Sequence, residues 1–287
     1  MSMRGRAVRI WESHIRPGLK LIGSIVMIAS AGAFFYGVTH QGDGPRRRDR
    51  YGCLADQPPA AHTFVVIDRT DAYSSAQAQS LRNELIRIGD AIEPGEMLTI
   101  ATIGSDLPAA IAFRGCSPER GDVPGIVESL RRDQDWLAVK REYEQSFLLP
   151  IHKLAEGIRL DQSSPHSPII QSLAGVLQEL GPSWSRAARR KVTLVSDLIE
   201  NTRAFSQYDM GDSARSFGEV RANVPYIRDT ALDLRGAAIT VLYLTGMPSD
   251  RDRQGPAHQR FWMDLVGYYG GNLIDWVVVP AAAESSH

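Results

Sequence analysis

The sequence predicts an α/β protein: a three-layer α/β/α sandwich with a mainly parallel central sheet, preceded by one membrane-spanning helix. Three observations lead to this prediction. Short apolar segments alternate with amphipathic ones from residue 63 onward, polar residues follow several of the apolar segments, and an uncharged stretch lies near the N-terminus. Strands that alternate with helices are typical of a parallel sheet covered on both faces.

The N-terminus combines a basic segment, residues 1–20, with an uncharged segment of eighteen residues, 21–38. A helix of that length spans about 27 Å at ~1.5 Å per residue, close to the ~30 Å hydrocarbon core of a bilayer. We expect an uncleaved single-pass anchor. The alternative is a cleaved signal peptide with residues 29–31 as its cleavage site, but the apolar run continues past that point to Val38.

Charge is divided unevenly along the chain. Residues 1–50 hold nine basic and three acidic side chains, a net charge of +6, while the whole chain carries −1 and the remainder therefore −7. An acidic folded part gives no electrostatic footprint for nucleic acid, so we expect no nucleic-acid partner. Arginines lie on both sides of the apolar stretch, and the positive-inside rule favours a cytoplasmic N-terminus with a periplasmic domain only weakly.

The chain contains two cysteines, Cys53 and Cys116. A single pair is what one structural disulfide in an oxidising compartment requires, and two separate buried thiols are the alternative. Cys53 falls within residues 39–62, where glycine, proline and charged residues without periodicity predict a linker.

The folded domain is expected over residues 63–280, followed by a short tail, 281–287. Apolar segments predict strands and amphipathic segments predict helices, with Ser167 capping a helix that Pro168 opens. The predicted strands are 63–68, 96–104, 107–115, 191–197, 237–246 and 273–280, and the predicted helices are 74–90, 133–160, 167–181 and 258–271. This order is Rossmann-like, and ligands of such sheets bind outside the carboxyl ends of the strands.

Oxygen-bearing side chains gather where two of these strands end and one helix begins. Asp68, Thr70 and Asp71 follow the first strand, Asp197 follows a later strand, and Ser167 opens a helix. Carboxylates and hydroxyls without histidine or thiol form a hard oxygen site, which suits Mg²⁺ or Mn²⁺. We therefore expect these five residues to hold a divalent cation.

This arrangement resembles the von Willebrand factor A (vWA) domain family over about residues 63–280. The metal-ion-dependent adhesion site of that family has an Asp-x-Ser-x-Ser loop, a later Thr or Ser, and a later Asp. Asp68 and Thr70 match the first and third loop positions, Ser167 the later hydroxyl, and Asp197 the later acid. The fifth position departs from the pattern, because Ala72 stands where serine is expected. Asp71 replaces the missing oxygen, or the site is weak or empty of metal.

The resemblance implies a protein-binding module rather than an enzyme, one in which an acidic side chain of the partner often completes the metal coordination. The loop after Asp197 would select the partner, and Arg203, Phe205 and Tyr208 are the expected contact residues. Motifs for serine hydrolases and for nucleotide-phosphate binding are absent from the sequence. A Mg²⁺-dependent phosphoesterase or nuclease using the same aspartates is one alternative, and a metal-free scaffold in an envelope assembly is another.

Overall fold

The structure is a computed structural model that describes residues 47–104, 109–121, 136–158, 164–210, 215–245 and 252–281. All but the first of these residues belong to one compact unit that begins at Arg48. The predicted anchor, residues 21–38, and most of the predicted tail lie outside the described residues. Within the described part, no helix has the length and apolar character needed to cross a bilayer.

The core of this unit is one six-stranded sheet with the strand order β3-β2-β1-β4-β5-β6. All neighbouring strands run parallel except β2 and β3, which are antiparallel at one edge. This order is the Rossmann-like one, so the prediction of a mainly parallel sheet is confirmed. The strands are β1 Ala61–Asp68, β2 Met97–Ile103, β3 Ala110–Cys116, β4 Arg189–Ser196, β5 Ala237–Thr245 and β6 Asn272–Pro280.

The central strand β1 is buried along its whole length, which its continuous apolar sequence predicts. Because successive side chains of a strand point to opposite faces, Phe64 and Val66 join one core cluster and Val65 and Ile67 join the other. The sheet is therefore the middle of three layers.

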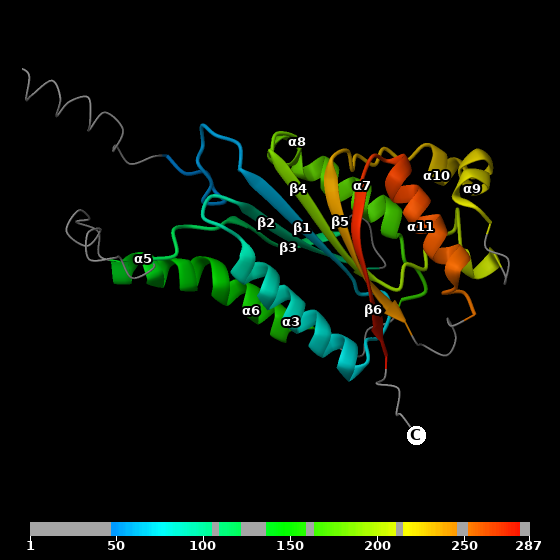
Figure 1. Cartoon of the computed structure of the whole chain (residues 1–287), viewed down its shortest axis with the longest axis horizontal. Helices are drawn as coiled ribbons and strands as arrows, with labels where there is room; N and C mark the ends of the chain where they lie inside the picture. The colour runs from blue at the N-terminus through cyan, green and yellow to red at the C-terminus, as the bar shows by residue number, and fades with distance from the viewer. Residues whose placement is uncertain are drawn as a thin grey trace, which may run out of the picture. The chain divides into compact units, whose positions relative to one another are not determined.

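Helices cover both faces of the sheet (Figure 1). One core cluster packs the sheet against α3 Ser75–Ala91, α5 Trp136–Tyr143, the π-helical turn η2 Glu144–Leu148 and α6 Leu149–Glu156. The other packs it against α7 Ile169–Leu180, α8 Pro182–Ser185, α9 Phe217–Asn223, α10 Pro225–Arg228 and α11 Pro256–Tyr268. A short 3₁₀ helix, η3 Gln207–Met210, lies between β4 and α9.

The local sequence explains where two of these helices begin and deform. Ser74 caps α3 in a reciprocal capping box with Gln77, as its hydroxyl and spacing predict. Pro150 lies at the start of α6. It has no N–H to donate, and its ring would crowd the preceding turn of a regular α-helix. The turn directly before α6 is π-helical instead.

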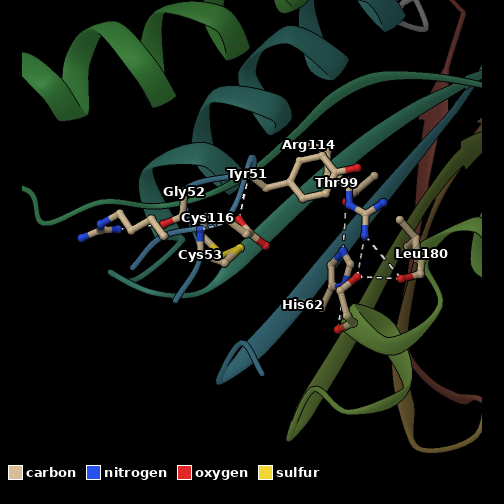
Figure 2. The surroundings of a disulfide bond; sticks show 11 residues. Tyr51, Gly52, Cys53, His62, Thr99, Arg114, Cys116 and Leu180 are labelled. Atoms are coloured by element: carbon tan, nitrogen blue, oxygen red, sulfur yellow. Dashed lines mark hydrogen bonds between the residues drawn. A yellow bond between two sulfur atoms is a disulfide. The ribbon is translucent and has the colours of Figure 1, made fainter. Parts of the chain in front are cut away.

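The edge of the sheet where the parallel strands begin and the antiparallel strand β3 ends is held together by a disulfide and a polar network (Figure 2). Cys53 and Cys116 form the predicted disulfide, with 5.1 Å between their Cα atoms. The backbone N–H of Cys116 donates to the carbonyl oxygen of Tyr51 at 2.8 Å, and the Arg114 guanidinium lies 4.3 Å from the centre of the Tyr51 ring. Residues around Cys53, which the sequence predicts as linker, are thus fastened to β3.

His62 lies at the same edge and is fully buried. Its Nδ1 lies 3.2 Å from the carbonyl oxygen of Ser183, and its Nε2 lies 2.9 Å from Thr99 Oγ1. Because a carbonyl only accepts, Nδ1 carries the proton and Nε2 accepts from the threonine hydroxyl. Burial lowers the pKa of His62 to about 4, so the ring is neutral at pH 7.

Candidate functional site

The candidate site lies at the opposite edge, where the carboxyl ends of β1 and β4 meet. The two strands pair in parallel, with Ile67 beside Val195, so Asp68 at the end of β1 and Asp197 just after β4 come out at the same edge. Both are buried: Asp68 is 4% exposed and Asp197 is 9% exposed. Two carboxylates at one buried edge need compensating donors.

Hydroxyl groups from two loops and from the end of β4 donate to the carboxylate of Asp68. Its Oδ1 accepts from the backbone N–H and the Oγ1 of Thr70, at 3.0 and 2.6 Å. Its Oδ2 accepts from Ser167 Oγ at 3.1 Å and from Ser196 Oγ at 2.8 Å. The phenol of Tyr73 donates to the backbone carbonyl of Asp68. The structure therefore brings together three of the predicted residues, Asp68, Thr70 and Ser167, by direct hydrogen bonds.

Backbone hydrogen bonds hold Ser167 in position, and its side chain does not cap a helix. Its N–H and carbonyl oxygen exchange hydrogen bonds with Asn201, at 2.8 and 3.0 Å. Helix α7 begins at Ile169 with Pro168 at its cap position, and no side chain of that cap accepts from the helix. The prediction that Ser167 caps this helix is wrong, because its hydroxyl donates to the Asp68 carboxylate. The N–H of Ile170 donates instead to Glu200 Oε2 at 2.9 Å.

Asp197 is fixed by a tight turn after β4. Its Oδ1 accepts from the backbone N–H of Ile199 at 2.9 Å, and Ser196 Oγ accepts from the N–H of Leu198 at 2.8 Å. Leu198 has a φ of 62°, and it is the one non-glycine residue with a left-handed backbone in the described ranges. Bulky residues rarely adopt this conformation, so the turn stores strain beside the site.

A small cavity of about 20 Å³ opens beside the two aspartates. That is room for one water molecule or ion. Nine residues line it: Asp68, Asp71, Ala72, Tyr73, Gln77, Asp197, Leu244, Thr245 and Gln254. Three of the lining residues are aspartates, and Ala72 is among the others, at the position where the vWA pattern has a hydroxyl.

Burial governs the electrostatics of the site. It raises the pKa of Asp68, and the hydrogen bonds from Thr70, Ser196 and Ser167 oppose that rise. Burial, followed by the nearby charges of Asp68 and Asp197, raises the pKa of Tyr73 well above its usual range. Both raised pKa values mean that negative charge in this pocket is energetically unfavourable. A bound cation would stabilise that charge.

Two residues of the site are missing from the sequence-based set. Ser196 bridges Asp68 and the turn at Leu198, and Glu200 accepts from Ile170 N–H and, at 2.7 Å, from the hydroxyl of Tyr226. Burial raises the pKa of Glu200 to about 8. Both lie within three residues of Asp197. The sequence feature that could have identified them is a hydroxyl directly before Asp197 and a second acid shortly after it.

The donor set fits a hard divalent cation. Asp68, Asp71 and Asp197 line the cavity, and Thr70 and Ser167 bring hydroxyl oxygens to the Asp68 carboxylate. Oxygen ligands with water completing an octahedron suit Mg²⁺ or Mn²⁺. Within the described residues, no group of three or more His, Cys, Asp or Glu side chains is arranged to hold a metal, so any site here depends on the hydroxyls.

The loop after Asp197 places the three expected partner residues differently. Arg203 is exposed at a turn that hydrogen bonds between Thr202 and Phe205 close. Phe205 is only 5% exposed and stacks on Phe261, with 6.0 Å between ring centres. The expectation that Phe205 contacts a partner is therefore corrected: it is a core residue, because its ring completes the cluster under α11. Tyr208 is half-buried, with Arg253 over its ring.

No protein-family model matches the sequence, and no curated protein matches it at a significant level. Among solved structures, the chain is similar to BatB from Bacteroides thetaiotaomicron, with 12% identity, 77% of this chain and 91% of that chain covered, and a TM-score of 0.38. It is similar to the SpRpn10 VWA domain, with 10% identity, coverage of 78% and 90%, and a TM-score of 0.38.

The manganese-loaded TRAP protein of Plasmodium vivax is a third similar structure, with 12% identity, coverage of 75% and 68%, and a TM-score of 0.36. These likenesses concern the fold alone.

Proposed function

We propose that this chain is a vWA-like protein-binding module, anchored to a membrane by residues 21–38, that uses a divalent cation at the carboxyl edge of its sheet to engage a protein partner. The observation that carries the proposal is the convergence on Asp68: Thr70, Ser167 and Ser196, from three separate segments of the chain, donate to one carboxylate. A turn-capping aspartate needs donors from its own loop only.

In this proposal Asp68, Thr70, Ser167 and Asp197 hold Mg²⁺ or Mn²⁺, and Asp71 supplies the oxygen that Ala72 lacks. The cation, when bound, offers a coordination position to an acidic side chain of the partner. Arg203 and Tyr208 lie on the loop that leaves the site and would contact the partner around that position. The partner is a protein in or near the membrane, in an envelope-associated assembly, and the domain is periplasmic.

Thermal unfolding with and without metal tests the cation site. A ligand that binds only the folded state stabilises it by RT ln(1 + [L]/Kd), or about 2.7 kcal/mol at one hundred times Kd. We expect Mg²⁺ or Mn²⁺ to raise the melting temperature of a fragment that begins at Arg48, and Asp68→Asn to remove that gain. Asp264→Asn, which removes an exposed carboxylate on α11, is the matched control and should keep the gain. An unchanged melting temperature of the wild-type fragment at millimolar metal would overturn the proposal.

A metal-free scaffold is the second candidate, and one observation favours it. Both oxygen atoms of the Asp68 carboxylate already accept two hydrogen bonds each from protein groups. The same carboxylate network could therefore serve only to fasten two loops and the end of β4 together. We propose no catalytic activity for the chain, and turnover of generic phosphoesters by the metal-loaded protein would contradict this.

A further inference from the structure

Two side chains from one segment of the chain hold consecutive carbonyl groups of the turn that carries Asp197. Gln254 lies just before α11, and His258 lies in its first turn. Gln254 Nε2 donates to the carbonyl oxygen of Asp197 at 3.2 Å, and His258 Nε2 lies 3.0 Å from the carbonyl oxygen of Leu198. Neither side chain belongs to the segments that supply the proposed cation ligands.

The amide of Gln254 has a fixed orientation. Its Nε2 also donates to the carbonyl oxygen of Leu244, at 2.7 Å, so both amide hydrogens face carbonyl acceptors. A flipped amide would place its oxygen against two other oxygens, which cannot hydrogen bond. Gln254 therefore ties the end of β5 to the turn after β4, beside the cavity that it lines with Asp197.

The ring of His258 is fixed in the same way. The carbonyl oxygen of Leu198 only accepts, so Nε2 carries the proton, and Nδ1 accepts from the hydroxyl of Tyr243 at 2.8 Å. His258 is 2% exposed and Tyr243 is fully buried. Burial lowers the pKa of His258 to about 4, which agrees with a neutral ring and this single tautomer.

The turn needs an external hold because of Leu198. Its left-handed backbone, with φ of 62°, is unfavourable for a bulky residue relative to an ordinary conformation. Relaxation of Leu198 would rotate the peptide groups on either side and turn the side chain of Asp197. The two carbonyls that Gln254 and His258 hold belong to those same peptide groups, Asp197–Leu198 and Leu198–Ile199.

We propose that Gln254 and His258 are positioning residues that keep the carboxylate of Asp197 directed at the cavity. The part of this inference that concerns metal affinity rests on the proposed cation site. The part that concerns the turn does not, since it predicts how rigidly Leu198 and Ile199 are held whether or not a metal binds.

The test uses the full-length protein and two measurements. Mn²⁺ binding is followed by the EPR signal of free Mn²⁺, and the rigidity of the turn is followed by hydrogen exchange at the Leu198 and Ile199 amides without metal. Gln254→Met removes the polar amide at nearly constant size. Gln259→Met is the matched control. Within the described part of the chain, the side chain of Gln259 makes no hydrogen bond that this substitution would remove. We expect Gln254→Met, relative to Gln259→Met, to weaken Mn²⁺ binding at least tenfold and to speed exchange at both amides about tenfold.

His258 is tested by a pair of substitutions. His258→Gln can present its Nε2 to the Leu198 carbonyl, whereas His258→Leu cannot. We expect His258→Gln to keep slow exchange at Leu198 and Ile199 and His258→Leu to lose it.

Each outcome decides one part of the inference. Wild-type protein that binds no Mn²⁺ would refute the proposed cation site, and the exchange data would still decide the positioning role. Exchange in Gln254→Met that matches the control would overturn the role of Gln254. Equal exchange in the two His258 variants would overturn the role of His258. Slow exchange combined with lost Mn²⁺ binding would overturn the positioning role, because the turn would still be held while the metal is lost.

Discussion

The buried acid Glu200 should make the folded state less stable as the pH rises. Its carboxylate is fully buried, accepts from the N–H of Ile170 at the start of α7, and accepts from the hydroxyl of Tyr226 in α10. These two hydrogen bonds favour the charged form, but burial outweighs them and raises the pKa of Glu200 to about 8 from an ordinary 4.5. The group therefore holds its proton in the folded protein at pH values where the unfolded chain has released it.

The sign and size follow from proton linkage. Between pH 4.5 and about 8 the folded state binds more protons at Glu200 than the unfolded state, so the stabilisation present below pH 4.5 is lost as the pH rises. Each pH unit within that window costs up to about 1.4 kcal/mol, which gives a total on the order of 5 kcal/mol. Glu200→Gln removes the titration, and its amide can accept from Ile170 and donate to Tyr226.

Urea unfolding of the fragment that begins at Arg48 measures this effect at pH 5, 6, 7 and 8. We expect wild-type stability to fall relative to Glu200→Gln across the series, so that the variant is the more stable protein at pH 8. Asp264→Asn, at an exposed acid on α11, is the control and should track the wild type. A constant difference between Glu200→Gln and wild type from pH 5 to pH 8 would refute the reasoning, because it would place the folded-state pKa of Glu200 near its ordinary value.

Three further predictions concern other parts of the domain. Replacing Cys53 and Cys116 together by serine should cost about 4 kcal/mol in urea unfolding, because the disulfide spans 63 positions; a loss below about 1 kcal/mol would show that the crosslink constrains little. Because burial lowers the pKa of His62 to about 4, the unfolded chain takes up its proton first as the pH falls, and stability should drop by up to about 3 kcal/mol between pH 6.5 and 4. His62→Gln should lack that drop in stability, and a pH profile identical to that of the wild type would contradict the prediction. The double variant Arg203→Ala, Tyr208→Ala should weaken capture of the partner from native membranes at an unchanged melting temperature, and normal capture would place the partner on another face.

The sequence by itself determined the fold class and the order of its elements. The continuous apolar run that became β1, the alternation of strands with helices, and the polar residues at strand ends are local signals, and each needs only hydrophobic periodicity and turn chemistry. The same signals selected Asp68 and Asp197, because a carboxylate at the end of a buried parallel strand stands out in one dimension. The two cysteines suggested a crosslink because they are a single pair.

Only the tertiary structure decided how these residues are used. Ser167 is placed where a helix cap belongs, yet its hydroxyl reaches Asp68, 99 positions earlier in the chain, because Asn201 holds its backbone. Phe205 has the sequence context of an exposed loop residue, but it stacks on Phe261 in the core.

The roles of Glu200, Gln254 and His258 likewise depend on which elements pack together. Glu200 bonds to the start of α7, and Gln254 and His258 bond to the turn after β4. The sequence around each of the three residues shows no local pattern that sets it apart. Local periodicity fixes which face of an element is apolar, whereas the partner of a buried polar group is set by contacts between segments far apart in the chain, and no local pattern encodes those contacts.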